Sequence, residues 1–210
     1  ITVMGQEEFS SEFDFAVIQE GEETLVDLLN ALENDGDLRE VQGLLYRDGN
    51  EVITTTPRPF LKNLDELPIP ARNKVDPLNY IFEVAGKGVI PVGTIELTRG
   101  CPFKCVFCSE PLNTGRGLRK RSPKSVVDEM LTVKGQHEIT HFFLLDSTLT
   151  LNRRLIEGFC QEVISRKVDI TWEGQTRANL IDEDLLLLMK EAGLVRLSFG
   201  VESADKEVLR

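Results

Sequence analysis

The second half of the chain alternates short apolar runs with segments in which apolar residues recur at helical spacing. The apolar runs are typical of strands, because each is short and nearly continuous, as in strands buried on both faces. They cover residues 92–98, 141–145, 168–172 and 195–199. We therefore predict an α/β fold with a parallel sheet that is covered by helices on its outside.

Three predicted helices lie between these strands, and each begins at a residue that favours helix N-termini. Ser122 precedes a proline, Asn152 precedes the second apolar stripe, and Asp182 precedes the third. Side chains of these types accept hydrogen bonds from the first free N–H groups of a helix. Gly135 and Gly193 suit the ends of the first and third helices.

The first 91 residues carry a different pattern. Residues 13–18 are typical of a strand followed by an amphipathic helix, and residues 41–56 are typical of a hairpin, since Asp48-Gly49 is a strong turn signal. Prolines then punctuate residues 57–91, and proline fixes φ and removes a donor, so we expect this linker to be extended and non-helical. The predicted parts of the chain are residues 1–56, 57–91 and 92–210.

Composition and charge narrow the functional classes. The chain has 210 residues and a formal net charge of −11, which disfavours non-specific nucleic-acid binding. No apolar run is long enough to span a membrane. The cysteines are clustered rather than spread as a disulfide framework, which favours a reducing cytoplasm. The chain starts at Ile1 and stops at Arg210 as a new helical pattern begins, so we expect a fragment, cut at both ends and less stable than its parent.

Three of the four cysteines, Cys101, Cys105 and Cys108, fall within eight residues after the first predicted strand. Thiolates packed this tightly suit zinc or an iron–sulfur cluster better than a hard cation. The fourth, Cys160, lies on an apolar helix face, where a cysteine usually packs as a small hydrophobe. Three ligands without a fourth indicate a cluster with one open iron. The alternative is a non-catalytic zinc or iron–sulfur binding module closed by Cys160.

Polar groups also follow the other predicted strands. In (βα) barrels the chemistry lies at the carboxyl ends of the strands, so we expect these segments to converge on one site. Their carboxylates, hydroxyls and single guanidinium would suit a small zwitterionic ligand that carries a ribose. The segments are residues 101–108, 146–148, 173–177 and 200–203.

The cysteine spacing, C-x-x-x-C-x-aromatic-C with Phe107 as the aromatic residue, resembles the signature of radical S-adenosylmethionine (SAM) enzymes. The resemblance implies that Cys101, Cys105 and Cys108 hold a 4Fe–4S cluster, whose fourth iron is chelated by the amino and carboxylate groups of SAM. It also implies one-electron reduction of SAM by a donor such as flavodoxin or ferredoxin. Methionine and a 5′-deoxyadenosyl radical would be released.

The same resemblance implies roles for residues at the strand ends. Phe107 would lie near the adenine, Arg177 would clamp the carboxylate with its planar fork, and Glu202 would meet the ribose or the amino group. Asp146 and Ser147 stand where many members carry a glycine-rich segment that binds the amino group, although this chain lacks those glycines. The residues assigned to SAM binding are Phe107, Asp146, Ser147, Glu173, Arg177, Glu202 and Ser203.

Two earlier stretches, residues 15–24 and 63–72, resemble the end of a cobalamin-binding domain and its connector to a radical SAM core. The resemblance implies a partial (βα) barrel of about four βα units, preceded by the C-terminal remnant of an α/β cobalamin-binding-type domain. Most of a cobalamin site would lie upstream of Ile1. The implied reaction is methylation, or cyclisation as in the anaerobic tetrapyrrole cyclases, on an unidentified substrate. A methylthiotransferase is disfavoured because no cysteine precedes Cys101.

A basic cluster and two histidines complete the candidate residues. We interpret the cluster as a solvated loop rather than as a docking site for an anionic substrate or an electron donor. His137 and His141 are interpreted as surface or core residues. The members of the cluster are Arg116, Arg119, Lys120, Arg121 and Lys124.

Overall fold

The computed structural model describes residues 9–75, 79–84, 86–205 and 207. The chain forms two compact units. The loop unit holds the residues up to Leu67 together with Gly100–Leu118, and the sheet unit holds Pro68–Arg99 and the residues from Arg119 onward. The two units are defined by contacts in space. The division predicted from the sequence, into residues 1–56, 57–91 and 92–210, stays a prediction.

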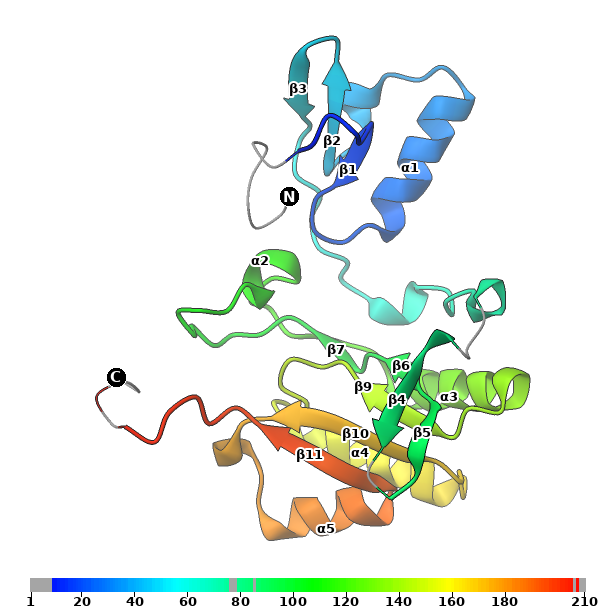
Figure 1. Ribbon diagram of the computed structural model, residues 1–210, viewed down its shortest axis with the longest axis vertical. Coiled ribbons are helices and arrows are strands. Elements are labelled where there is room, and N and C mark those ends of the chain that lie inside the picture. The colour runs from blue at the N-terminus through cyan, green and yellow to red at the C-terminus, as the bar shows by residue number, and fades with distance from the viewer. Residues whose placement is uncertain (1–8, 76–78, 85, 206, 208–210) are drawn as a thin grey trace. The chain divides into compact units, whose positions relative to one another are not determined.

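The sheet unit is built on a four-stranded parallel sheet with the order β11-β10-β9-β6. Three helices connect successive strands, and Figure 1 shows them together on one face of the sheet. This arrangement confirms the predicted parallel sheet with helices on its outside. The strands are β6 (Gly93–Ile95), β9 (His141–Leu144), β10 (Thr171–Thr176) and β11 (Leu194–Phe199), and the helices are α3 (Pro123–His137), α4 (Arg153–Ser165) and α5 (Glu183–Glu191).

The apolar core of the sheet unit lies between the sheet and these helices. Trp172 of β10 packs edge-on against Phe159 of α4, with ring centroids 5.5 Å apart. The indole N–H of Trp172 donates to the carbonyl oxygen of Ala192 at 2.8 Å, so the buried ring leaves no polar atom unsatisfied. This core fixes the helices against the strands whose ends carry the candidate site.

The predicted N-caps are confirmed. The Ser122 hydroxyl accepts a hydrogen bond from the Ser125 amide at 3.2 Å, and Asp182 accepts one from Leu185 at 3.0 Å. Asn152 caps α4 in the same way. Helix α3 runs on through Gly135 and ends at His137.

The third strand is displaced from its predicted position. Strand β10 starts three residues later than the predicted run and ends four residues later, at Thr176. The reason is that the amide of Val168 bonds back to the carbonyl of Val163 in α4 at 3.0 Å, so the first apolar residues complete the helix end instead of pairing in the sheet. Glu173 therefore lies inside the strand rather than beyond its carboxyl end.

The predicted first strand, residues 92–98, is two strands: β6, and β7 (Thr98–Arg99). Strand β7 leaves the parallel sheet and pairs antiparallel with β8 (Arg119–Lys120). The segment called an extended, non-helical linker is also more structured than predicted. It contains the hairpin of β4 (Ile81–Val84) and β5 (Gly88–Pro91), with 3-10 turns at Leu64–Glu66 and Arg72–Lys74. Asn63 stabilises the first turn by accepting from the Asp65 amide at 3.2 Å.

The loop unit contains a three-stranded antiparallel sheet and one longer helix. The predicted hairpin is confirmed, and Gly49 supplies the positive φ that its two-residue turn requires. The elements are β1 (Phe15–Val17), α1 (Glu22–Glu33), a 3-10 turn at Leu38–Glu40, β2 (Leu44–Asp48), β3 (Glu51–Thr54) and α2 (Glu110–Asn113). A further 3-10 turn, Ala178–Leu180, belongs to the sheet unit. Among the described residues, no helix combines the length and the apolar character needed to cross a membrane.

Candidate functional site

The three clustered cysteines lie on a loop that leaves the sheet after β6. Strands β7 and β8 pair at its base and form a stem, Thr98–Arg99 with Arg119–Lys120. Inside the loop, the Cys101 amide donates to the Gly115 carbonyl oxygen at 3.1 Å. Gly100 has a φ of +94°, and a Cβ there would overlap the carbonyl oxygen of Gly117. Only glycine fits this position without a shift of the backbone.

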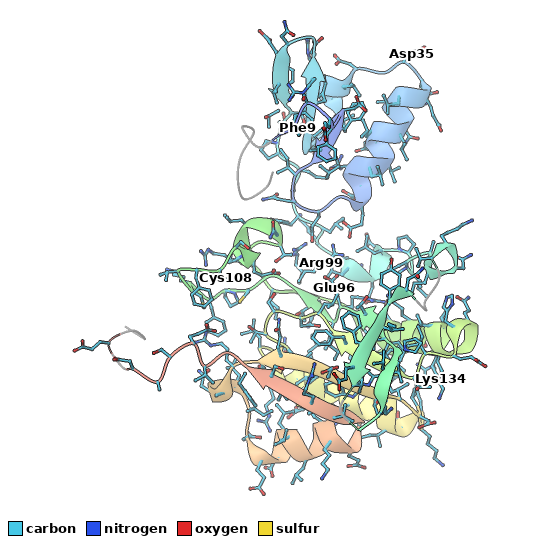
Figure 2. All side chains as sticks on the ribbon, viewed as in Figure 1. Phe9, Asp35, Glu96, Arg99, Cys108 and Lys134 are labelled. Carbon is cyan, nitrogen blue, oxygen red and sulfur yellow. The ribbon has the colours of Figure 1, made fainter. Side chains whose placement is uncertain are left out.

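The thiols differ in exposure. Cys101 is buried, Cys105 is half-buried, and Cys108 is exposed. Figure 2 labels Cys108 on this loop. The Cys108 amide donates to the Cys105 carbonyl oxygen at 3.2 Å, which closes a tight turn between them. Phe107 within this turn is 68% exposed, so its ring is available to a ligand.

The donor set fits an iron–sulfur cluster better than a single ion. Among the described residues, no group of three or more histidine, cysteine, aspartate or glutamate side chains is arranged to hold one metal ion. A zinc site needs its thiolates around one atom, with each sulfur about 2.3 Å from it. In a 4Fe–4S cluster each cysteine binds a different iron, so the thiols stand farther apart. Three soft thiols on one short loop are the type of donor that such clusters take.

Cys160 is unavailable as a fourth ligand. It is fully buried in the apolar core of the sheet unit, as the sequence analysis expected of a small hydrophobe. Burial, with a smaller contribution from the negative charge of Glu157, raises the pKa of the Cys160 thiol to about 12. The thiolate is the form that binds metals, and burial of Cys160 in the apolar core disfavours that form. The closed module that needed Cys160 therefore lacks its ligand.

Asp146 lies two residues beyond the end of β9, and its side chain is buried. One carboxylate oxygen accepts from the Leu97 amide at 3.0 Å, and the other accepts from the Thr98 hydroxyl at 2.5 Å. Burial outweighs these hydrogen bonds and raises the pKa of Asp146 to about 6. Ser147, the next residue, is half-buried. Both oxygens of Asp146 are thus engaged by the segment between β6 and the stem.

Glu173 faces other protein groups from within β10. Its Oε1 lies 3.1 Å from Nε2 of His141, and its Oε2 pairs with the Arg196 guanidinium of β11. Nδ1 of His141 lies 2.8 Å from the Thr171 hydroxyl, which accepts from Lys87 at 2.7 Å. His141 is the first residue of β9 and is fully buried, so it is a core histidine. Glu173 thus lies inside β10 rather than beyond its end, with His141 and Arg196 as partners, and its assignment to SAM binding stays a prediction.

The remaining assigned residues follow strands of the parallel sheet. Arg177 follows β10 and is half-buried. Glu202 and Ser203 follow β11; Glu202 is exposed with a φ of +60°, and Ser203 is half-buried. With Asp146 and Ser147, these residues occupy the carboxyl ends of three adjacent strands. Their convergence with the cysteine loop on one ligand stays a prediction.

The basic cluster is largely engaged by the protein itself. Arg121 pairs with Glu129 at 2.5 Å, and Lys124 pairs with Asp128 at 2.6 Å. Arg116 donates to the Phe103 carbonyl oxygen at 2.9 Å. These contacts favour a structural role and weaken the case for an anion-docking surface.

A buried ion triad lies beside β6 and was not predicted from the sequence. Glu129 of α3 is 2% exposed and holds both Arg121 and Arg72 at 2.5 Å. Arg72 also donates to the carbonyl oxygen of Thr94 at 2.6 Å, which covers the free edge of β6. The available signal was the position of Glu129, which falls on the apolar stripe of α3 at helical spacing from Val133.

Comparisons with known proteins give the class. The family model of the Radical SAM superfamily matches residues 95–210, more than half of the chain. The chain belongs to the radical SAM superfamily. The family implies a 4Fe–4S cluster and SAM as cofactors. Cys101, Cys105 and Cys108 lie within the matched range, and their role as cluster ligands stays a prediction.

Among curated relatives, an uncharacterized methyltransferase of Pyrococcus horikoshii is 34% identical over 196 residues, which is 93% of this chain and 42% of the relative. The anaerobic magnesium-protoporphyrin IX monomethyl ester cyclase of Cereibacter sphaeroides is 37% identical over 198 residues, 91% of this chain and 32% of the enzyme. This chain thus spans about a third to two fifths of the length of these relatives.

Solved structures share the fold. The radical SAM methyltransferase TsrM from Kitasatospora setae, with tryptophan and a SAM analogue bound, matches 93% of this chain and 39% of its own at a TM-score of 0.75 and 22% identity. The cobalamin-dependent radical SAM enzyme OxsB, with aqua-cobalamin and SAM bound, matches 97% of this chain and 30% of its own length. Its TM-score is 0.77 and its sequence identity is 23%. Both matches extend before the parallel sheet, which confirms the predicted fold of a partial barrel with an α/β region in front.

Proposed function

We propose that this chain is the cluster-bearing part of an enzyme that cleaves SAM reductively. The observation that carries the proposal is the stem-closed loop with three thiols, placed directly after the first strand of a parallel sheet. Cys101, Cys105 and Cys108 would hold the cluster. When bound, the cluster would pass one electron from a donor such as flavodoxin or ferredoxin to SAM, whose reductive cleavage gives methionine and a 5′-deoxyadenosyl radical.

The protein's own residues orient the ligand. Exposed Phe107 offers a flat apolar surface to the adenine, and the Arg177 fork suits the SAM carboxylate. Ser147, Glu202 and Ser203 offer acceptors and hydroxyls to the amino group and ribose. Asp146 and Glu173 already bind other protein groups through their carboxylates. We therefore assign them to supporting the sheet and its adjoining loop rather than to binding SAM.

The relatives and neighbours support a cobalamin-linked reaction on a small molecule. The curated relatives include methyltransferases and cyclases, and a structural neighbour contains cobalamin together with SAM. We propose methyl transfer or cyclisation as the outcome, with most of the cobalamin site outside this chain. Neither a membrane nor nucleic acid is a proposed partner. Cysteines that form no disulfide and a reduced cluster suit a reducing compartment such as the cytoplasm.

The test is anaerobic reconstitution of the chain with iron and sulfide, followed by metal analysis and electron paramagnetic resonance (EPR) after reduction. We expect about four iron and four sulfide per chain, and a change in the EPR signal when SAM is added. A Cys105→Ala variant should lose the cluster, whereas Cys160→Ala should keep it. Tight binding of zinc with no cluster would refute the proposal.

A further inference from the structure

The backbone between β6 and the stem departs from the parallel sheet. Strand β6 ends at Ile95, whose carbonyl oxygen accepts the last bond from Leu145 at 2.9 Å. Strand β7 begins at Thr98, so Leu97 falls in the break. Its carbonyl oxygen accepts from the Arg121 amide at 2.9 Å, and its amide donates to Asp146 at 3.0 Å. A side chain thus supplies the partner that a neighbouring strand would otherwise provide.

Asp146 accepts hydrogen bonds from two groups between the end of β6 and the start of the stem. Besides the Leu97 amide, its carboxylate accepts from the hydroxyl of Thr98, the first residue of the stem. The side chain is 1% exposed, and no described cationic side chain forms an ion pair with it. The like charge of Glu96 adds to the cost of ionising it. A buried carboxylate in such surroundings is useful as an acceptor of two hydrogen bonds rather than as a charge.

We propose that Asp146 is a positioning residue that fixes the stem from which the cysteine loop leaves the sheet. The proposal rests on the proposed function, because the loop is taken to hold the cluster. The two acceptor oxygens bridge β9 to residues 97 and 98, four and three residues before the first cluster cysteine. The structure thus gives Asp146 a task different from the SAM contact that the family resemblance implies.

Asparagine separates the two roles. In Asp146→Asn the amide oxygen can still accept from the Leu97 amide, and the amide nitrogen can donate to the Thr98 hydroxyl oxygen. A positioning role therefore survives this change, whereas a role that depends on negative charge against the SAM ammonium does not. Asp146→Ala removes both contacts, and Thr98→Val removes one. Thr150→Val is the matched control, because its buried hydroxyl bonds to Thr176 at 2.6 Å and makes no contact with the stem.

The first readout needs no cluster: amide hydrogen exchange of Leu97 in the apo protein. We expect exchange to be about tenfold to a hundredfold faster in Asp146→Ala, near wild type in Asp146→Asn, and unchanged in Thr150→Val, because only the first removes the acceptor of the Leu97 amide. Unchanged exchange in Asp146→Ala would overturn the proposal, whether or not the wild-type protein assembles a cluster.

The second readout is the reconstituted protein. We expect Asp146→Ala and Thr98→Val to alter the EPR signal of the reduced cluster before SAM is added, and Asp146→Asn to restore it. If Asp146→Ala leaves the SAM-free signal unchanged and both Asp146 variants lose the response to SAM, Asp146 is a ligand and the proposal is wrong. A wild-type protein without a cluster would refute the proposed function, while the exchange result still decides the role of Asp146 in the stem.

Discussion

The buried triad beside β6 gives the largest predicted effect on stability. Glu129 is 2% exposed, and its two oxygens each hold one guanidinium at 2.5 Å, from Arg72 and Arg121. The arginine side chains are only 19% and 14% exposed, so water can replace little of what is lost. In Glu129→Gln the amide oxygen still accepts a hydrogen bond from one arginine. The NH2 group faces the other arginine, and the two groups repel because both are hydrogen-bond donors.

The magnitude follows from breaking a buried ion pair, which costs about 3–5 kcal/mol when one partner is removed. We expect the lower end, about 3 kcal/mol, because Arg72 and Arg121 keep other acceptors, the carbonyl oxygen of Thr94 and the hydroxyl of Ser125. With an m-value of about 2 kcal/mol/M, the midpoint of urea unfolding should fall by about 1.5 M.

The control is the neighbouring residue on the same helix. Asp128 pairs with Lys124 and Arg166 at 2.6 and 2.7 Å, but these side chains are substantially exposed. Asp128→Asn should therefore lower the free energy of unfolding by less than about 1 kcal/mol. If Glu129→Gln costs no more than Asp128→Asn, the argument from burial is wrong.

Three further predictions concern the loop, the core and pH. Ala at Gly100 would overlap the Gly117 carbonyl oxygen, so Gly100→Ala should lower the iron content after reconstitution, whereas Gly117→Ala, which meets open space, should not. Cys160→Ala should keep full iron content and lose about 1 kcal/mol of unfolding free energy by urea titration, because it leaves a small cavity. The pKa of Asp146 is raised from 3.8 to about 6, so its contribution to stability is present below pH 4 and is lost as pH rises through 6. The unfolding free energy of Asp146→Asn minus that of wild type should therefore rise by about 2 kcal/mol between pH 4 and pH 7, and a flat difference would contradict the burial of the charge.

Local signals in the sequence predicted much of the fold. The caps at Ser122, Asn152 and Asp182 could be predicted because each acts on amides two or three residues away. The hairpin at Gly49 was predictable for the same reason. The cysteine loop was recognisable because its chemistry is concentrated in eight residues.

The features that could not be predicted are contacts between residues far apart in the chain. Glu173 was placed at a ligand site because the strand boundary was drawn from apolar residues alone, and its partner His141 lies 32 residues away. The Asp146 carboxylate was read as free for a ligand, although its acceptors serve an amide 49 residues earlier. The β4–β5 hairpin escaped notice because proline punctuation masked its short strands. No single-sequence pattern specifies such pairings.

The most direct test of the central claim is the quantity of 5′-deoxyadenosine and methionine formed when the reconstituted, reduced protein meets SAM under anaerobic conditions. We predict that the wild-type protein forms both products in equal amounts. Cys101→Ala should form neither product, and Cys160→Ala should form as much of each as wild type. A fully assembled 4Fe–4S protein that binds SAM yet releases neither product would contradict the claim that this chain carries the SAM-cleaving machinery.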